Sequence, residues 1–303
     1  MRPGGFILAL FGVFWPFLCT PLDRKIYGRS GGRDVSRGEG PDLNRKDYDA
    51  LLELPLSGWG WEYARRFPEL KKAAARARRT APVMIERRDG VRLIRLRRRY
   101  PEAEEFGLQF FPDPEKSALE TTPFWLPEAA NSSLEAALEF EEMHARKGRT
   151  LSWTALPGEK HFLIGPGRRP KLVVAAKGYA AQIAIEENML PVPQAVYLSL
   201  RLGAGQLVGE HLRAVEEFAA FCHGAKGRCR MLRGLSPERL RDAIIALDGE
   251  LAGFPRRKIG EAIFGAEAVA RGWDVGDESY KKRTKRLVEK GLALMEFGYR
   301  KLL

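Results

Sequence analysis

The sequence predicts an α+β protein with a helical N-terminal domain, a central antiparallel β-rich region and a C-terminal helical domain of helix-turn-helix type. Three observations predict this fold class. Aromatic and basic segments with a helical period come first, short apolar runs separated by Gly and Pro follow, and every segment after residue 234 has a helical period. We place the domain boundaries at residues 43–130, 131–225 and 235–303, with residues 1–42 as a leader.

The leader has the composition of a segment outside any folded core. Gly5 to Cys19 is apolar, but it is shorter than the ~20 residues that a membrane span needs, and Pro16 would break a helix there. The Gly- and Arg-rich stretch that follows has no apolar period. We expect the true start of the protein near residues 35–45, with a membrane anchor as the alternative.

Residues 43–130 begin with predicted helices. A short apolar period runs from Asp47 to Leu54, and the aromatic-rich segment from Ser57 to Pro68 reads as a helix that the serine caps and the proline ends. Glu69 to Arg79 is a second, strongly basic helix. In Met84 to Arg99, alternating apolar residues flank Asp89-Gly90, which predicts a β-hairpin. Two aromatic segments add short strands or loops: Phe106–Phe111 and Pro123–Pro127.

The central region is predicted to open with a helix and to continue as a sheet. Asn131 to Arg146 is the helix, because Ser132-Ser133-Leu134-Glu135 reads as a capping box. Five apolar runs separated by turn residues are the expected strands: Leu151–Leu156, His161–Ile164, Lys171–Ala175, Ala180–Ile185 and Val196–Leu202. A helix over Leu207–Phe221 and a Gly- and Arg-rich linker over Gly224–Gly234 complete the region.

Three helices are predicted in residues 235–303. Ser236-Pro237 is a strong helix start, and the apolar residues after it form one stripe, made of Leu240, Ile244, Leu247 and Leu251. Pro255–Gly265 is a short helix that Gly265 ends. After a connection around Gly272-Trp273-Asp274, the longest helix begins near Asp277-Glu278-Ser279.

The last helix has two unlike faces. Its inner face consists of Tyr280, Thr284, Leu287, Gly291 and Leu294. Its outer face carries Lys281, Lys282, Lys285 and Arg286. A short helix followed by a longer one with a cationic outer face is the layout of a helix-turn-helix. These four cations are therefore the candidates for base edges and phosphates, with Arg256, Arg257 and Lys258 on the flanking backbone; an ordinary amphipathic surface helix is the alternative.

The charge and the cysteines restrict the class of protein. A formal net charge of +12 favours an anionic partner: nucleic acid, an anionic membrane or an acidic protein. The alternative is that the charge serves solubility alone. Three cysteines form no disulfide framework and fit a reducing compartment, so we expect a cytoplasmic protein. A zinc site could be drawn from four side chains: His211, Cys222, His223 and Cys229. Their spacing matches no common zinc-site pattern, so we expect no metal.

Four blocks follow one another in the C-terminal region: Ala246–Gly253, Arg257–Gly265, Arg283–Gly291 and Met295–Leu303. In this order they resemble the DNA-binding domain of RovC-type bacterial transcriptional regulators, a family typified by an activator of type VI secretion genes. The resemblance covers roughly the last 70 residues. It implies a transcriptional regulator, an activator, whose partner is double-stranded DNA.

A second group of segments lies upstream: Gly58–Pro68, Phe106–Leu108 and Pro123–Pro127. Together they resemble the N-terminal domain that often accompanies the RovC-type domain. The stretch between them, Lys71 to Glu105, is longer and more basic than this resemblance implies, and the central region matches the family only loosely.

Two other functions remain open from the residues. Val196–Leu202, the glycine-rich turn Gly203–Gly209 and the following helix are close to a dinucleotide-binding fingerprint, although a turn joining sheet to helix is the simpler interpretation. The other alternative is an interaction protein that binds a partner with its aromatic N-terminal helix. The sequence contains no evident catalytic set, so we expect no enzymatic activity and no cofactor.

We also expect a symmetric oligomer, because two reading helices about one DNA turn apart select an operator better than one module does. The central sheet is the first candidate for the interface. The second is an aromatic set for which core packing is the simpler interpretation: Trp59, Trp61, Tyr63 and Phe67. A regulator of this kind has RNA polymerase or a regulatory protein as a further candidate partner.

Overall fold

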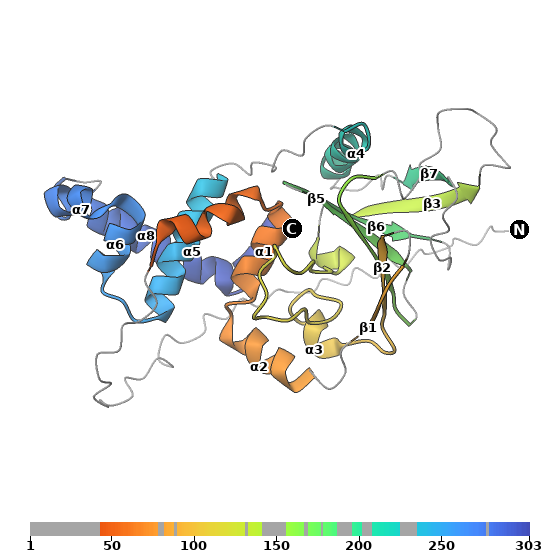
Figure 1. The fold of residues 1–303 in the computed structure, drawn as a ribbon, viewed down its shortest axis with the longest axis horizontal. Coiled ribbons are helices and arrows are strands. Elements are labelled where there is room, and N and C mark those ends of the chain that lie inside the picture. The colour runs from red at the N-terminus through yellow and green to blue at the C-terminus, as the bar shows by residue number, and fades with distance from the viewer. Residues whose placement is uncertain are drawn as a thin grey trace, which may run out of the picture. The chain divides into compact units, whose positions relative to one another are not determined.

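The computed structural model describes residues 43–77, 82–87, 90–130, 133–140, 156–166, 169–176, 178–186, 196–201, 208–224, 235–276 and 279–303 (Figure 1). All of them belong to one compact unit, Pro41–Leu303. The predicted leader, residues 1–42, lies outside the described residues. Within the described part of the chain, no helix is both long and apolar enough to cross a membrane.

Helices come from both ends of this unit. The N-terminal ones are η1 (Arg45–Glu53), α1 (Leu56–Ala64), α2 (Pro68–Ala77), α3 (Pro101–Glu104) and η3 (Pro127–Ala129). Those after the sheet are α4 (Val208–Cys222), α5 (Pro237–Leu251), α6 (Arg256–Phe264), α7 (Ala266–Gly272), α8 (Tyr280–Met295) and η6 (Gly298–Leu302). The helices predicted within residues 57–79 are thereby confirmed as α1 and α2. The serine cap is wrong, because α1 starts one residue before Ser57 and Pro55 stands at its N-cap.

Seven strands form one sheet: β1 (Val83–Glu86), β2 (Val91–Arg95), β3 (Leu134–Phe140), β4 (Glu159–Ile164), β5 (Lys171–Ala176), β6 (Tyr179–Ile185) and β7 (Val196–Arg201). Their order across the sheet is β1-β2-β4-β5-β6-β3-β7. The α+β class is confirmed, but the sheet is mixed rather than antiparallel, because β2 runs parallel to β4 and β3 runs parallel to β6. The predicted hairpin is present as β1 and β2, with Met84 opposite Ile94.

The helix predicted over Asn131–Arg146 is wrong. Leu134–Phe140 is strand β3, which pairs with β7 in antiparallel fashion and with β6 in parallel fashion. Burial alternates along the strand, since Leu134 and Ala136 are buried while Glu135 is exposed. That period of two is the pattern of a strand, and the neighbours on both sides override the local helical propensity of its Ala and Glu residues.

The other predictions for the central region agree with the structure where it describes them. The last four of the five predicted runs are β4, β5, β6 and β7, and the helix after them is α4. Residues 151–155 of the first run and the turn residues 202–207 lie outside the described residues.

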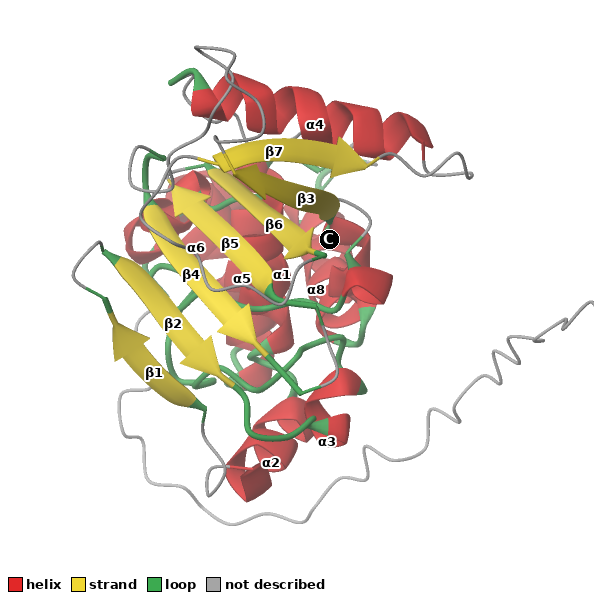
Figure 2. Ribbon diagram, turned by 90° about the vertical axis from the view of Figure 1, so that its right-hand side faces the viewer, coloured by secondary structure: helices red, strands yellow, loops and turns green. Residues whose placement is uncertain are grey.

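The two faces of the sheet pack against different partners. Phe162, Val174 and Ile183 face α4, where Phe218 and Phe221 complete a buried cluster, and Figure 2 shows α4 running along the β7 end of the sheet. Leu163 and Val173 belong to the opposite face and join the helical core. The sheet therefore separates α4 from the remaining helices.

One hydrophobic core joins the N-terminal and the C-terminal helices. It contains Trp59 and Tyr63 of α1 together with Leu240 of α5 and Tyr299 of η6. The Tyr63 hydroxyl donates a 2.7 Å hydrogen bond to the carbonyl of Leu240, across 177 residues of sequence. Because these contacts cross the sequence boundaries at residues 130 and 235, the C-terminal helices take their position from the N-terminal ones.

Candidate nucleic-acid interface

Two glycines let the C-terminal helices pack at close range. A Cβ atom at Gly291 of α8 would lie 2.7 Å from the carbonyl oxygen of Ala243 in α5. A Cβ atom at Gly260 of α6 would lie 2.9 Å from the hydroxyl oxygen of Thr284 in α8. Real Cβ atoms do not tolerate such distances, so only glycine permits these approaches. They fix the orientation of the exposed faces of α6 and α8.

α5 is the central helix of this group. Ser236 caps its first turn, as predicted. Leu240, Ile244 and Leu247 of the predicted stripe are fully buried, but Leu251 is 48% exposed because the helix ends there. α5 packs against α8, α6 and η1, and so it connects the outer helices with the N-terminal part of the core.

α6 ends at Gly265, as predicted, with a φ of 90° that disfavours any side chain. A further helix, α7, begins at the next residue, Ala266, and the prediction of a plain connection misses it. A signal for α7 is present in the sequence: Glu267 lies in its first turn and Val269 is its buried residue.

α8 has the two faces that its sequence predicts. The inner face is buried or half-buried at every predicted position: Tyr280, Thr284, Leu287, Gly291 and Leu294. It also buries Val288 and Met295, which the predicted set omits. The four outer cations are all exposed: Lys281, Lys282, Lys285 and Arg286. The helix therefore presents a continuous basic strip, as the periodicity indicates.

The first turns of α6 and α8 carry cations and no acidic residue. These cations are Arg256, Arg257 and Lys258 on α6 and Lys281 and Lys282 on α8, all exposed. A helix N-terminus is the positive end of the helix dipole, where a charge changes stability by about 0.3–1 kcal/mol. α5 and α7 follow the favourable rule, with Glu238 and Glu267. The placement on α6 and α8 costs stability in the free protein and favours a bound anion.

Acidic residues lie against four of the cations, two on the same helix as the cation and two on neighbouring segments. The pairs are Arg256–Glu250 at 3.0 Å, Arg257–Glu261 at 3.3 Å, Lys281–Asp274 at 2.9 Å and Lys285–Glu289 at 3.8 Å. Exposed pairs of this kind contribute about 0–1 kcal/mol each. A phosphate group can therefore replace these carboxylates at little cost.

Arg283 is a cation of this surface that the sequence prediction missed. Its guanidinium carbon lies 4.4 Å from the ring centre of Phe264 in α6 and 5.2 Å from that of Tyr280. The predicted outer strip leaves it out, although its spacing of three residues from Tyr280 is a usable signal. Because both rings hold it, Arg283 presents a charge in a fixed place where α6 meets α8.

Arg66, which follows α1, links the N-terminal helices to α5. It makes a bidentate ion pair with Asp248 of α5, at 2.6 and 2.9 Å, and a 2.7 Å bond to Glu62. Burial alone would raise the pKa of Glu62, but Arg66, Arg65 and the backbone N–H of Ala118 outweigh it and hold that pKa below its ordinary value. The carboxylate is charged at neutral pH and fixes Arg66 on α5.

The aromatic N-terminal helix is part of the core. Trp59, Trp61 and Tyr63 are fully buried, and Phe67 packs partly buried against the same cluster. Core packing, the simpler interpretation of these rings, is therefore confirmed, and Trp59, Trp61 and Tyr63 are not available as an interaction surface or a second oligomer interface.

The arrangement around β7 differs from that of a dinucleotide-binding fold. β7 pairs with β3 in antiparallel fashion over six residues, from Val196 opposite Phe140 to Arg201 opposite Glu135, and it ends the strand order. A nucleotide fold needs a parallel neighbour at this point. Most of the turn, Gly203–Leu207, lies outside the described residues; Gly209 is in the first turn of α4.

The described residues contain no group of three His, Cys, Asp or Glu side chains placed to hold a metal ion. Of the four side chains considered for zinc, His211, Cys222 and His223 lie on or at the end of α4, and Cys229 lies outside the described residues. Burial raises the pKa of the Cys222 thiol, which is half-buried beside the α4 cluster.

Comparison with known families addresses the C-terminal part. A search of curated proteins finds no match to the chain. A family model described as the DNA-binding domain of a type VI secretion system (T6SS) transcription factor, RovC_DNA-bd, matches residues 198–303. The match begins within β7, upstream of residue 235, and includes α4 to α8 and η6. The resemblance of the C-terminal region to RovC-type regulators is confirmed, and residues 198–303 are similar to a transcription factor DNA-binding domain of this type.

Proposed function

We propose that the protein is a transcriptional activator that binds double-stranded DNA with α6 and α8. In this proposal the outer strip of α8 enters the major groove, in the manner of a helix-turn-helix, and the first turn of α6 contacts the flanking backbone. The observation that carries it is the set of exposed cations on the first turns of both helices, at the ends where anions bind best. Contact with RNA polymerase or a regulatory protein would then follow from the DNA-bound state.

The test is a double charge reversal on α8, Lys282→Glu with Arg286→Glu. We expect DNA binding to be lost at moderate salt while the protein stays folded, because both side chains are exposed. Single replacements by alanine separate the two kinds of contact. Loss of a phosphate contact lowers the salt slope of log affinity by about 0.9, and loss of a bidentate base contact costs about 1–3 kcal/mol and relaxes specificity at one position.

The matched control is Lys72→Glu with Arg76→Glu on α2. These two cations are also exposed and also four residues apart, so the change in net charge and the helical spacing are the same. Unchanged affinity in the folded α8 variant, or equal losses in both variants, would reject α8 as the DNA-contacting helix.

We further propose that the protein acts as a symmetric oligomer that pairs through the central sheet. Strand β1 supports this choice, because it stands at the end of the strand order and β2 is its one neighbour among the described strands. Its side chains Val83, Met84 and Ile85 are 39%, 61% and 49% exposed. An apolar edge strand is a template for pairing with a second chain.

A further inference from the structure

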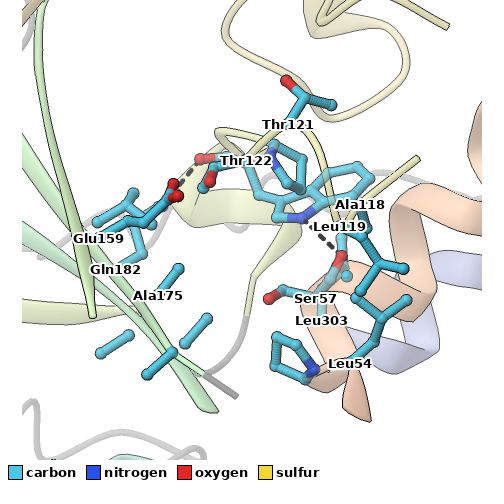
Figure 3. A pocket seen from close by; sticks show the side chains of 18 of the residues that line it. Leu54, Ser57, Ala118, Leu119, Thr121, Thr122, Glu159, Ala175, Gln182 and Leu303 are labelled. Atoms are coloured by element: carbon cyan, nitrogen blue, oxygen red, sulfur yellow. Dashed lines mark hydrogen bonds between the residues drawn. The ribbon is translucent and has the colours of Figure 1, made fainter. Parts of the chain in front are cut away.

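A cavity of about 280 Å³ lies between the sheet and the N-terminal helices. Figure 3 shows Glu159, Ala175 and Gln182 from the sheet on one side and Leu54 and Ser57, near the start of α1, on the other. The volume is just below the ~300–1,000 Å³ that sites for drug-sized molecules have. The cavity is therefore large enough for a small ligand.

Apolar groups form most of its walls. Leu54, Trp125, Val173 and Leu303 line it. Ala175 of β5 and Ala180 of β6 also line it and are cross-strand partners. Both are only half-buried, so their small side chains leave the space open. A ligand with an apolar body fits these walls.

The charged groups of the cavity all have the same sign. Glu53, Glu120 and Glu159 line it, and none of the described residues that line it is Lys or Arg. Glu159 has outside partners, since its Oε2 lies 3.1 Å from Arg92 and 3.1 Å from Nε2 of His161. In a protein with a net charge of +12, an acidic pocket of this kind selects a cation.

The walls of the cavity are connected to the DNA-binding helices. Trp125 links both sides, because its indole N–H donates to the carbonyl of Ser57 and its own carbonyl accepts from Gln182 at 2.8 Å. Leu303 follows η6, and the Trp125 ring lies 5.7 Å from that of Tyr299 in η6. η6 packs against α1 and α8. An occupant of the cavity would therefore touch groups that position α8.

We propose that this cavity is an effector site for a small apolar amine, whose ammonium group lies at the carboxylates and whose body lies against the alanines and Trp125. Binding there changes DNA affinity through α1 and η6, and this regulatory part rests on the proposed function. The site itself does not depend on it.

The binding experiment uses three probes of similar size on the full chain: 2-phenylethylamine, 2-phenylethanol and 3-phenylpropanoate. Calorimetry should give at least a tenfold preference for the amine over the alcohol, equal to about 1.4 kcal/mol, and weaker binding still for the carboxylate. Ala175→Leu and Ala180→Leu fill the cavity and should abolish binding. Glu120→Gln, at an exposed position, should remove most of the preference for the amine, whereas the exposed Glu102→Gln outside the cavity should not.

Equal binding of amine and alcohol, tightest binding of the carboxylate, binding that survives both leucine variants, or a preference for the amine that survives Glu120→Gln overturns the site. The first-turn N–H groups of α1, which has no side-chain cap, would explain a preference for the carboxylate. For the regulatory part, saturating amine should change the Kd for DNA at least fivefold, and DNA should change the Kd for amine by the same factor. Amine binding without any change in DNA affinity refutes the regulation. Amine binding in a protein that never binds DNA refutes the proposed function and leaves the site standing.

Discussion

Replacing Gly291 by alanine tests the close approach of α8 to α5. The new Cβ atom would lie 2.7 Å from the carbonyl oxygen of Ala243 and 2.9 Å from Cβ of Leu247. The first distance is about 0.7 Å short of the 3.4 Å at which ordinary contact begins. The carbonyl belongs to the backbone of a buried helix and cannot turn away, so the two helices must separate.

Two effects of opposite sign decide the magnitude. Overpacking a tight interface costs about 1–3 kcal/mol, and alanine gains up to about 1 kcal/mol over glycine inside a helix. We therefore expect a net loss of about 1–2 kcal/mol in the free energy of unfolding. For a unit of this size the melting temperature falls by about 2–4 °C per kcal/mol.

Thermal and urea denaturation measure this loss, and Gly209→Ala is the matched control. Gly209 also lies in a helix, α4, but nothing is within 4 Å of a Cβ atom there. The control should be as stable as the wild type or slightly more stable. A Gly291→Ala protein with the stability of this control, and with unchanged affinity for DNA, would refute the close packing of α5 and α8 and the fixed orientation of the basic strip derived from it.

Two further predictions concern the ion pairs of Arg66 with Glu62 and Asp248 and the edge strand β1. The pKa of Glu62 is lowered in the folded protein, so its contribution to stability is present above its ordinary value near 4.5 and is lost as the pH falls through the lowered pKa. Glu62→Gln should lower the free energy of unfolding by about 3 kcal/mol at pH 7, and the variant should lose less stability than the wild type as the pH falls below 4.5. The exposed Glu115→Gln should show neither effect. If the stability of the wild type and of Glu62→Gln depended on pH in the same way, the role given to this carboxylate would be contradicted. At the sheet edge, Met84→Lys with Ile85→Lys should shift the protein to monomers in sedimentation equilibrium, and Leu212→Lys, at an exposed position on α4, should not. A wild-type protein that is monomeric at micromolar concentration, both free and on DNA, would end the proposal of an oligomer.

Local patterns predicted the elements whose signals are local. Ser236-Pro237 starts α5, Gly265 ends α6 with a φ of 90°, and the period of α8 separates its buried and exposed faces. The β1–β2 hairpin follows from Asp89-Gly90 between alternating apolar residues. Each of these rules concerns residues that are close together in the sequence, where the chain itself determines the geometry.

The failures arise where distant contacts decide the structure. Leu134–Phe140 contains Ala and Glu residues and follows two serines, which favour a helix locally, but its position between β6 and β7 makes it a strand. The two parallel pairs of the sheet have no local signal. The same holds for the pair of Arg66 with Asp248, which are 182 residues apart. Local sequence patterns therefore could not predict how α5 packs against the rest of the protein.

The packing of α5 shows why the N-terminal helices matter for the DNA-binding part. Leu240 and Ile244 of α5 are fully buried in a core that Trp59 of α1 also enters. The same helix carries Ala243 against Gly291 of α8. A fragment with only the C-terminal helices would expose that apolar face and leave Asp248 without Arg66. The position of the basic strip depends on packing between helices from both ends of the chain. Substitutions in α1 therefore change the orientation of α8 even when every cation of the strip is kept.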